Sequence, residues 1–190
     1  MARKLYSIIL GCCVLFLLPT IAFSGDFITN KQTMFTPDKK EIGYINKGAE
    51  VEKKNDNLSI TGWVMDGNEY IIFYSNTARI RLARIDKIYI KDMTILKTIK
   101  DEYDVTWKQV SLEFTLDDNT KISSSRATLW DKETKLYQRC GSCHTNFPPH
   151  EFTPNQWPQL IKTMKSNAGL TNDDVKQLGV YLQYQSIKEY

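Results

Sequence analysis

Short runs of alternating apolar and polar residues follow one another between residues 42 and 129. The runs are rich in β-branched and aromatic side chains, and a period of two places the apolar side chains on one face of a strand. They comprise residues 50–52, 58–64, 69–74 and 78–83. Between two of these runs, Asp-Gly-Asn at residues 66–68 is typical of a hairpin turn. This part of the chain is therefore predicted to be β-rich.

A weak internal repeat runs through the same stretch. Trp63 and Trp107 are each followed, at nearly equal distances, by an Asn-Thr pair and then by a short segment that begins with alanine. The predicted units, residues 44–87 and 88–129, each have the size of a small SH3-like barrel, which closes its own sheet edges. Coincidence in a strand-rich region with two tryptophans is the alternative. Neither unit holds a cluster of residues suited to catalysis, so docking or anchoring is its predicted role.

After residue 129 the apolar spacing becomes that of helices. Residues 131–144 are predicted to form one helix. A second begins at Thr-Pro-Asn-Gln, residues 153–156, either as a capping box or with Asn155 as the cap, and a third begins at residues 171–174. The apolar stripes are Trp157, Leu160, Ile161 and Met164 in the second helix and Val175, Leu178 and Leu182 in the third.

These patterns together predict an α+β protein. A β-rich, SH3-like region is expected over residues 25–129, with the two possible repeats inside it. A small, all-helical domain is expected over residues 130–190.

Residues 1–24 have the features of a signal peptide. Arg3 and Lys4 supply a positive start, residues 5–23 are almost wholly apolar, and Ala-Phe-Ser at residues 22–24 precedes Gly25 as the predicted mature start. The same stretch is long enough to be an uncleaved membrane anchor. Residues 9–12 also resemble a lipobox, although one placed too early. All three alternatives predict export, with a periplasmic location and, if the segment is not cleaved, membrane association.

Removing the signal changes both the charge and the cysteine count. The formal net charge falls from +3 to +1, because Arg3 and Lys4 leave and no acidic residue does. A chain so close to neutral is not expected to bind nucleic acid. Cys12 and Cys13 belong to the targeting segment, so only two cysteines remain in the exported part.

Those two cysteines and both histidines lie within residues 137–150. The run Cys-Gly-Ser-Cys-His at residues 140–144 has the spacing of a c-type haem attachment site. Cys140 and Cys143 would bind the two vinyl groups of one covalently attached haem c, and His144 would bind its iron. Tyr137 and Trp157 are predicted to contact the haem, and packing in the helical core is the alternative for both.

Two other uses of the motif fit less well. A redox disulfide of the thioredoxin type requires a strand before the motif and an α/β domain after it, whereas the residues that follow here are predicted to be helical. A zinc site would have to use Cys140, Cys143, His144 and His150, and the adjacent Cys143 and His144 are poorly placed to share one tetrahedral ion.

The sixth iron ligand has two candidates. Met164 lies late on the second helix, just before a loop, from where a thioether can approach the opposite face of the haem. His150 is only six residues after His144, a short tether for reaching that face. Met164 is the preferred prediction, His150 is the alternative, and a vacant or lysine-bound site is a third possibility.

Several segments resemble one known family. They are Cys-Gly-Ser-Cys-His, the proline-rich loop after it, Thr-Pro-Asn-Gln-Trp-Pro, Lys-Thr-Met, Leu-Thr and Tyr-Leu-Gln-Tyr. They resemble the C-terminal monohaem domain of the pentahaem cytochromes that donate electrons to trimethylamine N-oxide reductase. The tryptophan-bearing β region is similar to the segment before that domain. The sequence lacks the family's four-haem, quinol-oxidising half, so a shuttle or a docking cytochrome is expected rather than direct quinol oxidation.

The resemblance implies an electron-transfer protein and not an enzyme. Its expected partners are a periplasmic molybdopterin oxidoreductase that reduces an N- or S-oxide and an upstream membrane cytochrome that oxidises quinol. The alternative is a haem-based ligand sensor or binder, which would need an open or weakly held sixth position. Five cations between residues 132 and 165 are also expected to frame an exposed haem edge, unless they are simply solvated helix faces: Lys132, Lys135, Arg139, Lys162 and Lys165.

Overall fold

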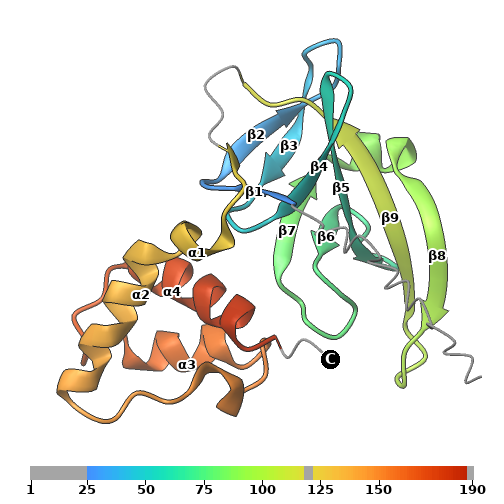
Figure 1. The fold of residues 1–190 in the computed structure, drawn as a ribbon. Helices are drawn as coiled ribbons and strands as arrows, with labels where there is room; N and C mark the ends of the chain where they lie inside the picture. Colours follow the sequence, from blue (N-terminus) through green and yellow to red (C-terminus); the bar gives the residue numbers. More distant parts are fainter. Residues whose placement is uncertain (1–24, 118–121, 188–190) are drawn as a thin grey trace, which may run out of the picture.

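The computed structural model describes residues 25–117 and 122–187. Within them, strands gather into one curled sheet and the helices pack beside it (Figure 1). The predicted α+β class is therefore confirmed. The predicted signal peptide, residues 1–24, lies outside the described residues. No helix of the described part is long and apolar enough to cross a membrane.

The strands follow the alternating runs of the sequence. The hairpin turn predicted at residues 66–68 is present: Gly67 has a φ of +80° and the Asn68 amide donates a hydrogen bond to the Met65 carbonyl. The strands are β1 (Asp26–Ile28), β2 (Gln32–Phe35), β3 (Glu41–Ile45), β4 (Glu50–Lys54), β5 (Asn57–Met65), β6 (Ile71–Phe73), β7 (Arg81–Ile85), β8 (Thr94–Lys100), β9 (Thr106–Phe114) and β10 (Ile122–Ser123).

The sheet curls until it meets itself. Antiparallel pairs link β9, β5, β6, β7, β3 and β2 in that order. Phe35, at the end of β2, then exchanges two backbone hydrogen bonds of 2.9 and 2.8 Å with Thr115, just beyond β9. This exchange closes the path into a small barrel. Apolar side chains fill its interior, where Ile60, Ile72 and Phe114 are completely buried.

The two possible repeats do not form separate barrels. Strand β9, from the second stretch, pairs with β5, from the first, along its length, from Leu58 opposite Phe114 to Met65 opposite Trp107. The apolar residues of β9 are buried because they share the interior of the first unit. The two tryptophans also differ, since Trp107 is fully buried and Trp63 is only half-buried.

The helical part consists of short segments after residue 125. The predicted helix over residues 131–144 is shorter than expected, because it ends at Gln138 and a 3₁₀ turn follows. The Asn146 side-chain amide donates to the Tyr137 carbonyl over 3.0 Å and so satisfies an acceptor that a continuing helix would use. The segments are α1 (Arg126–Leu129), α2 (Asp131–Gln138), η2 (Arg139–Ser142), η3 (Pro149–Glu151), α3 (Trp157–Met164) and α4 (Asn172–Gln185), while η1 (Lys87–Asp92) lies in the β part.

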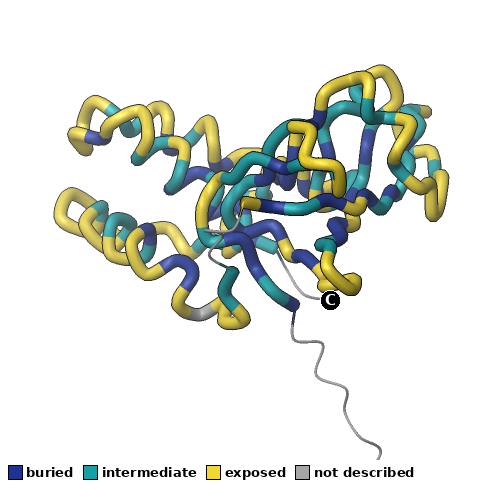
Figure 2. The backbone as a smooth tube through the Cα atoms, turned by 90° about the horizontal axis from the view of Figure 1, so that it is seen from above, coloured by how far each residue is buried: buried dark blue, intermediate teal, exposed yellow. Residues whose placement is uncertain are grey.

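Both predicted apolar stripes face a common helical core. Trp157, Ile161, Leu178 and Leu182 are buried in it. Helix α4 begins as predicted, with a capping box in which the Thr171 hydroxyl accepts from the Asp174 amide and the Asp174 carboxylate accepts from the Thr171 amide. Figure 2 shows buried positions concentrated inside the curled sheet and along the inner sides of the helices.

Helix α3 begins later than predicted. It starts at Trp157, and the Gln156 side chain reaches back to accept hydrogen bonds from the Thr153 amide and hydroxyl over 2.8 and 2.9 Å. Pro158 occupies the second helical position, where no amide hydrogen is needed.

Asn155 contacts the β part instead of capping α3. Its side-chain nitrogen donates to the Thr77 carbonyl over 2.7 Å, and its oxygen accepts from the Arg79 amide over 2.8 Å. These bonds attach the start of α3 to the loop before β7.

Aromatic rings fill the rest of the contact between the two parts. The Trp130 and Tyr184 rings lie 5.5 Å apart in a tilted arrangement, and Tyr184 contacts Tyr74 of the β part edge to face at 6.1 Å. Gly48 lies directly beneath them with a φ of +87°, and a Cβ atom there would lie 2.6 Å from Tyr184 and 2.7 Å from Trp130. Only glycine fits at this point.

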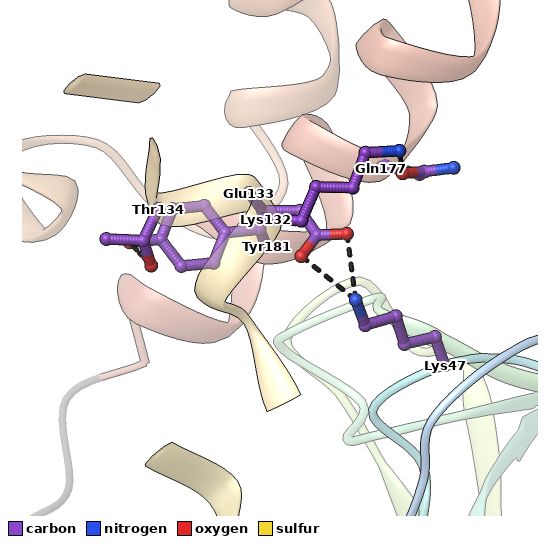
Figure 3. A network of polar contacts seen from close by, with 6 residues as sticks. All are labelled: Lys47, Lys132, Glu133, Thr134, Gln177 and Tyr181. Carbon is purple, nitrogen blue, oxygen red and sulfur yellow. Dashed lines mark hydrogen bonds and ion pairs between the residues drawn. The ribbon is translucent and has the colours of Figure 1, made fainter. Parts of the chain in front are cut away.

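A buried ion pair also joins the two parts (Figure 3). Glu133 on α2 is only 1% exposed, and both of its carboxylate oxygens accept from the Lys47 ammonium over 2.8 and 2.9 Å. The Lys47 ammonium also lies 4.8 Å from the centre of the Trp130 ring. A buried carboxylate without its cation is strongly destabilising.

Replacement of Lys47 is therefore expected to weaken the whole fold. Lys47→Met should lower the free energy of unfolding by about 2 kcal/mol, because Glu133 keeps its burial and loses its partner. Urea denaturation measures the change. The matched control is Lys54→Met, which removes an exposed pair with Glu113 and should cost less than about 0.5 kcal/mol. Equal losses in the two variants would show that the pair adds nothing to the contact between the two parts.

Candidate haem site

Most of the predicted site residues line one cavity in the helical part. The cavity has a volume of about 510 Å³, within the range of pockets that hold drug-sized ligands and cofactors. Its walls come from the end of α2, from η2 and from the loop between α3 and α4. The lining residues are Leu136, Arg139, Cys140, Ser142, Cys143, His144, Met164, Asn167, Ala168 and Leu170.

The two cysteines reach the cavity because the helix tightens after Gln138. In the 3₁₀ turn η2, the Cys143 amide donates to the Cys140 carbonyl over 3.4 Å, and the Ser142 hydroxyl donates to the Arg139 carbonyl over 2.9 Å. Both thiols are free, with Cys140 half-buried and Cys143 exposed. Burial raises the pKa of the Cys140 thiol. Two free thiols on one turn are thus available to a ligand in the cavity.

His144 lines the cavity, and one of its two ring nitrogens has a hydrogen-bond partner. Its Nδ1 atom lies 2.8 Å from the Thr145 carbonyl oxygen, so a proton on Nδ1 is donated to that carbonyl. This bond leaves Nε2 with a free lone pair, the form that binds a metal. The Phe147 ring lies 5.6 Å from the imidazole and limits its rotation.

Met164 enters the same cavity from the other chain segment. It is the last residue of α3 and is half-buried. The chain after it is fixed by Gly169, whose φ is +60°, by a bond from the Gly169 amide to the Ser166 carbonyl, and by one from the Leu170 amide to the Lys165 carbonyl. This is the Schellman arrangement, which holds the loop that closes the cavity. His150, the alternative ligand, is exposed on η3 and does not line the cavity.

Tyr137 and Trp157 lie behind the cavity and not in its wall. Their rings meet edge to face at 6.2 Å, and Tyr137 also contacts Tyr181 of α4 at 6.4 Å. The Trp157 indole donates to the Pro149 carbonyl over 2.9 Å, and the Tyr137 hydroxyl donates to the Phe147 carbonyl. Burial raises the pKa of Tyr137 to about 12. Both residues pack in the helical core and support the segment that carries the motif, and their contact with the haem stays a prediction.

Several lining residues were not singled out by the sequence. Leu136 and Leu170 contribute apolar surface to the cavity. Leu136 lies within the helix predicted over residues 131–144, and Leu170 comes just before the helix predicted to begin at residues 171–174. Arg139 was noted only as one of five cations, yet it lines the cavity, where its charge suits an anionic group such as a haem propionate.

The sequence did not indicate a role for Asn146 either. Its Oδ1 atom is buried without a hydrogen-bond partner and faces Gly141 in the middle of the motif. No regular spacing marks either the asparagine or Arg139 in advance.

The residues around the cavity fit a covalently bound haem. Two free thiols, a histidine with an available nitrogen, a thioether and apolar walls border one space. Within residues 25–117 and 122–187, no group of three or more His, Cys, Asp or Glu side chains is arranged to hold a metal ion. These are the residues with which the class of c-type cytochromes holds its haem.

Comparisons with known proteins agree with this class. A model of the family described as dihaem cytochrome c matches residues 136–190. The cytochrome c-type protein TorY of Haemophilus influenzae is 29% identical over 127 residues, which cover 66% of this chain and 34% of the relative. TorY of Escherichia coli O157:H7 is 27% identical over 153 residues, covering 77% of this chain and 41% of the relative. No solved structure matches the chain.

The predicted resemblance is thereby confirmed, and the chain is similar to TorY-type cytochromes c. The relatives' names describe c-type cytochromes, which are electron carriers, in agreement with the prediction of an electron-transfer protein and not an enzyme. The chain spans less than half the length of these relatives. The matching family model is described as dihaem, whereas this sequence contains a single Cys-x-x-Cys-His motif.

Proposed function

We propose that the exported chain is a periplasmic cytochrome with one haem c that passes electrons to a molybdopterin N- or S-oxide reductase. The reductase would be of the trimethylamine N-oxide or dimethyl sulfoxide type, and a membrane cytochrome that oxidises quinol would supply the electrons. The observation that carries the proposal is the single cavity bordered by Cys140, Cys143, His144 and Met164. The similarity to TorY supports the choice of reductase.

In this proposal each residue of the cavity has a separate task. Cys140 and Cys143 would form the two thioether bonds, and the Thr145 carbonyl holds His144 so that Nε2 would be available to the iron. The Met164 thioether would supply the second protein ligand. Bound in this way, the haem supplies a one-electron carrier, and a thioether ligand raises its reduction potential relative to two histidines. The apolar walls from Leu136, Ala168 and Leu170 restrict water and favour the less charged, reduced state.

The β part has no separate catalytic constellation in this scheme. It holds the helical part in one orientation through Asn155, the Lys47 to Glu133 pair and the Tyr74 contact with Tyr184. A rigid arrangement presents the haem domain and the barrel to a partner as one surface. Docking, as predicted from the sequence, remains the role that we propose for it.

Electron transfer to the reductase tests the proposal. Reduced cytochrome mixed with the oxidised reductase in a stopped-flow instrument should be oxidised with the kinetics of a bimolecular reaction. Turnover with trimethylamine N-oxide should then continue as long as reduced cytochrome is supplied. A cytochrome that stays reduced beside an active reductase would contradict the proposed partner.

Carbon monoxide separates the carrier from the ligand sensor. With Met164 bound to the iron, carbon monoxide should leave the spectrum of the ferrous protein unchanged on mixing, because no coordination position is open. A rapid shift of the main absorption band would instead favour the sensor.

A further inference from the structure

A second and larger hollow lies between the two parts of the molecule and is bordered by α2 and α3, which also border the haem cavity. Its volume is about 750 Å³. The β part contributes the turn before β4, the end of β6 and the start of β7, and the helical part contributes α2, α3 and α4. Below it is called the interdomain groove.

Cations dominate the lining of the interdomain groove. Seven lysine or arginine side chains face only two carboxylates, those of Glu133 and Asp173. Glu133 is held by Lys47, as Figure 3 shows, and Asp173 lies 3.6 Å from Lys176. The remaining five cations form no ion pair with a carboxylate of the described residues: Lys31, Arg79, Arg81, Lys132 and Lys162.

The partners that three of these cations do have are neutral. Lys31 lies over the Tyr44 ring at 3.6 Å, Arg79 lies over the Trp107 ring at 5.6 Å, and Lys132 donates to the Gln177 side-chain oxygen over 3.2 Å. Each side chain is therefore oriented without forming an ion pair within the described residues, and only longer-range attractions, of Lys132 to Asp174 and of Arg79 to Asp101, act on these charges. A concave surface lined by charge of one sign concentrates the electrostatic field and attracts the opposite charge.

The size and the walls of the groove indicate what kind of anion it suits. Phe73, Trp130, Val175 and Val180 add apolar surface between the cations. The five cations come from five separate segments, and the space is far larger than one phosphate group. An extended polypeptide with carboxylates and apolar side chains matches both features.

The groove is also connected to the haem cavity through two shared helices. Helix α2 carries Lys132 at its start and leads into Cys140, while α3 carries Lys162 in the groove and ends at Met164 in the cavity. A partner seated in the groove therefore rests on the two segments that hold the iron ligands.

We propose that the interdomain groove is the docking site for an acidic polypeptide segment of the protein that accepts the electrons. The inference rests on the proposed function only for the identity of that acceptor. It changes the expectation from the sequence. Of the five cations predicted to frame the haem edge, Arg139 lines the haem cavity, whereas Lys132 and Lys162 line the groove.

The first test uses a fluorescein-labelled octaglutamate peptide and the haem-loaded, full-length mature protein. The variant Arg81→Glu/Lys162→Glu reverses one cation from each part of the groove. It should weaken peptide binding on the order of tenfold, and the native affinity should fall steeply with salt. The matched control, Lys91→Glu/Lys97→Glu, makes the same change in net charge at two exposed cations outside the groove and should weaken binding less than about twofold.

Two results would overturn the docking site. Equal weakening by both double variants would mean that net charge alone attracts the peptide. Tighter binding of inorganic pyrophosphate than of the peptide, lost in the groove variant, would assign the groove to a small anion. Unchanged far-ultraviolet circular dichroism and haem spectra confirm that the variants are folded.

The second test separates this inference from the proposed function. In stopped-flow mixing with the oxidised reductase, the groove variant should react on the order of tenfold more slowly than the control variant at low salt. Equal rates in the two variants, with the reductase still reduced, would reject the docking site and keep the function. Peptide binding that depends on the groove, with no reduction of the reductase by the native protein, would reject the named acceptor and keep the docking site.

Discussion

The variant Cys140→Ala/Cys143→Ala, produced in a host that exports and matures c-type cytochromes, is expected to carry no covalent haem. Both thioether bonds depend on these two thiols, which are free and border the same cavity as His144. A denaturing gel stained for haem should show no band at the mass of the variant. Acidified organic solvent should extract any haem that remains. The loss is expected to be complete, because the described part of the chain contains no other cysteine.

Ser142→Ala is the matched control for that experiment. Ser142 lies between the two cysteines, where its hydroxyl donates to the Arg139 carbonyl and contacts the Cys143 sulfur at 3.8 Å, and it supplies no thiol, so attachment should persist. A double cysteine variant that stains as strongly as the native protein would show that the haem is held elsewhere. A Ser142→Ala protein without haem would show that the turn geometry, and not the thiols, had been tested.

Met164→Ala is expected to produce the second large effect. The thioether is the soft donor in the cavity wall on the segment opposite His144, and its removal leaves the iron with one strong protein ligand. The weak sulfur-to-iron charge-transfer band should disappear, and the ferric iron should become high spin or take a substitute ligand. The reduction potential should fall by a measurable part of the roughly 0.8 V range that axial ligands span. Redox titration followed by absorbance measures both changes.

His150→Ala is the control for the sixth ligand. His150 is exposed on η3 and outside the cavity wall, so the band and the potential should be those of the native protein. The opposite pattern, with the band lost in His150→Ala and kept in Met164→Ala, would move the assignment to His150.

Local sequence rules were sufficient for much of the helical part. The spacing of Trp157 and Ile161 predicted the buried side of α3, and residues 171–174 predicted the start of α4. The motif at residues 140–144 and the late position of Met164 were both available from spacing. The structure then brings those residues to one cavity, which spacing alone does not require.

The features that sequence rules missed depend on contacts between distant residues. Strand β9 joins β5 because Val110, Leu112 and Phe114 are buried in the interior of the first unit. The similarity of the two repeats does not indicate this pairing in advance. Helix α2 ends early because Asn146, eight positions beyond its last residue, satisfies the Tyr137 carbonyl.

Local sequence patterns do not predict the interdomain groove either. Lys47 and Glu133 are 86 positions apart, and Arg81 and Lys162 face a common space only because the two parts pack in one orientation. Charge counted along the sequence grouped Lys132 with Arg139, whereas the fold separates them into two sites.

The central claim is that the exported protein carries one haem attached through the motif at residues 140–144. Intact-mass spectrometry of the native protein, followed by peptide mapping, tests this claim most directly. The account predicts the mass of the mature chain plus a single haem, with the added mass on the peptide that contains Cys140 and Cys143. An unmodified mass, or haem that separates from the chain on denaturation, would contradict it.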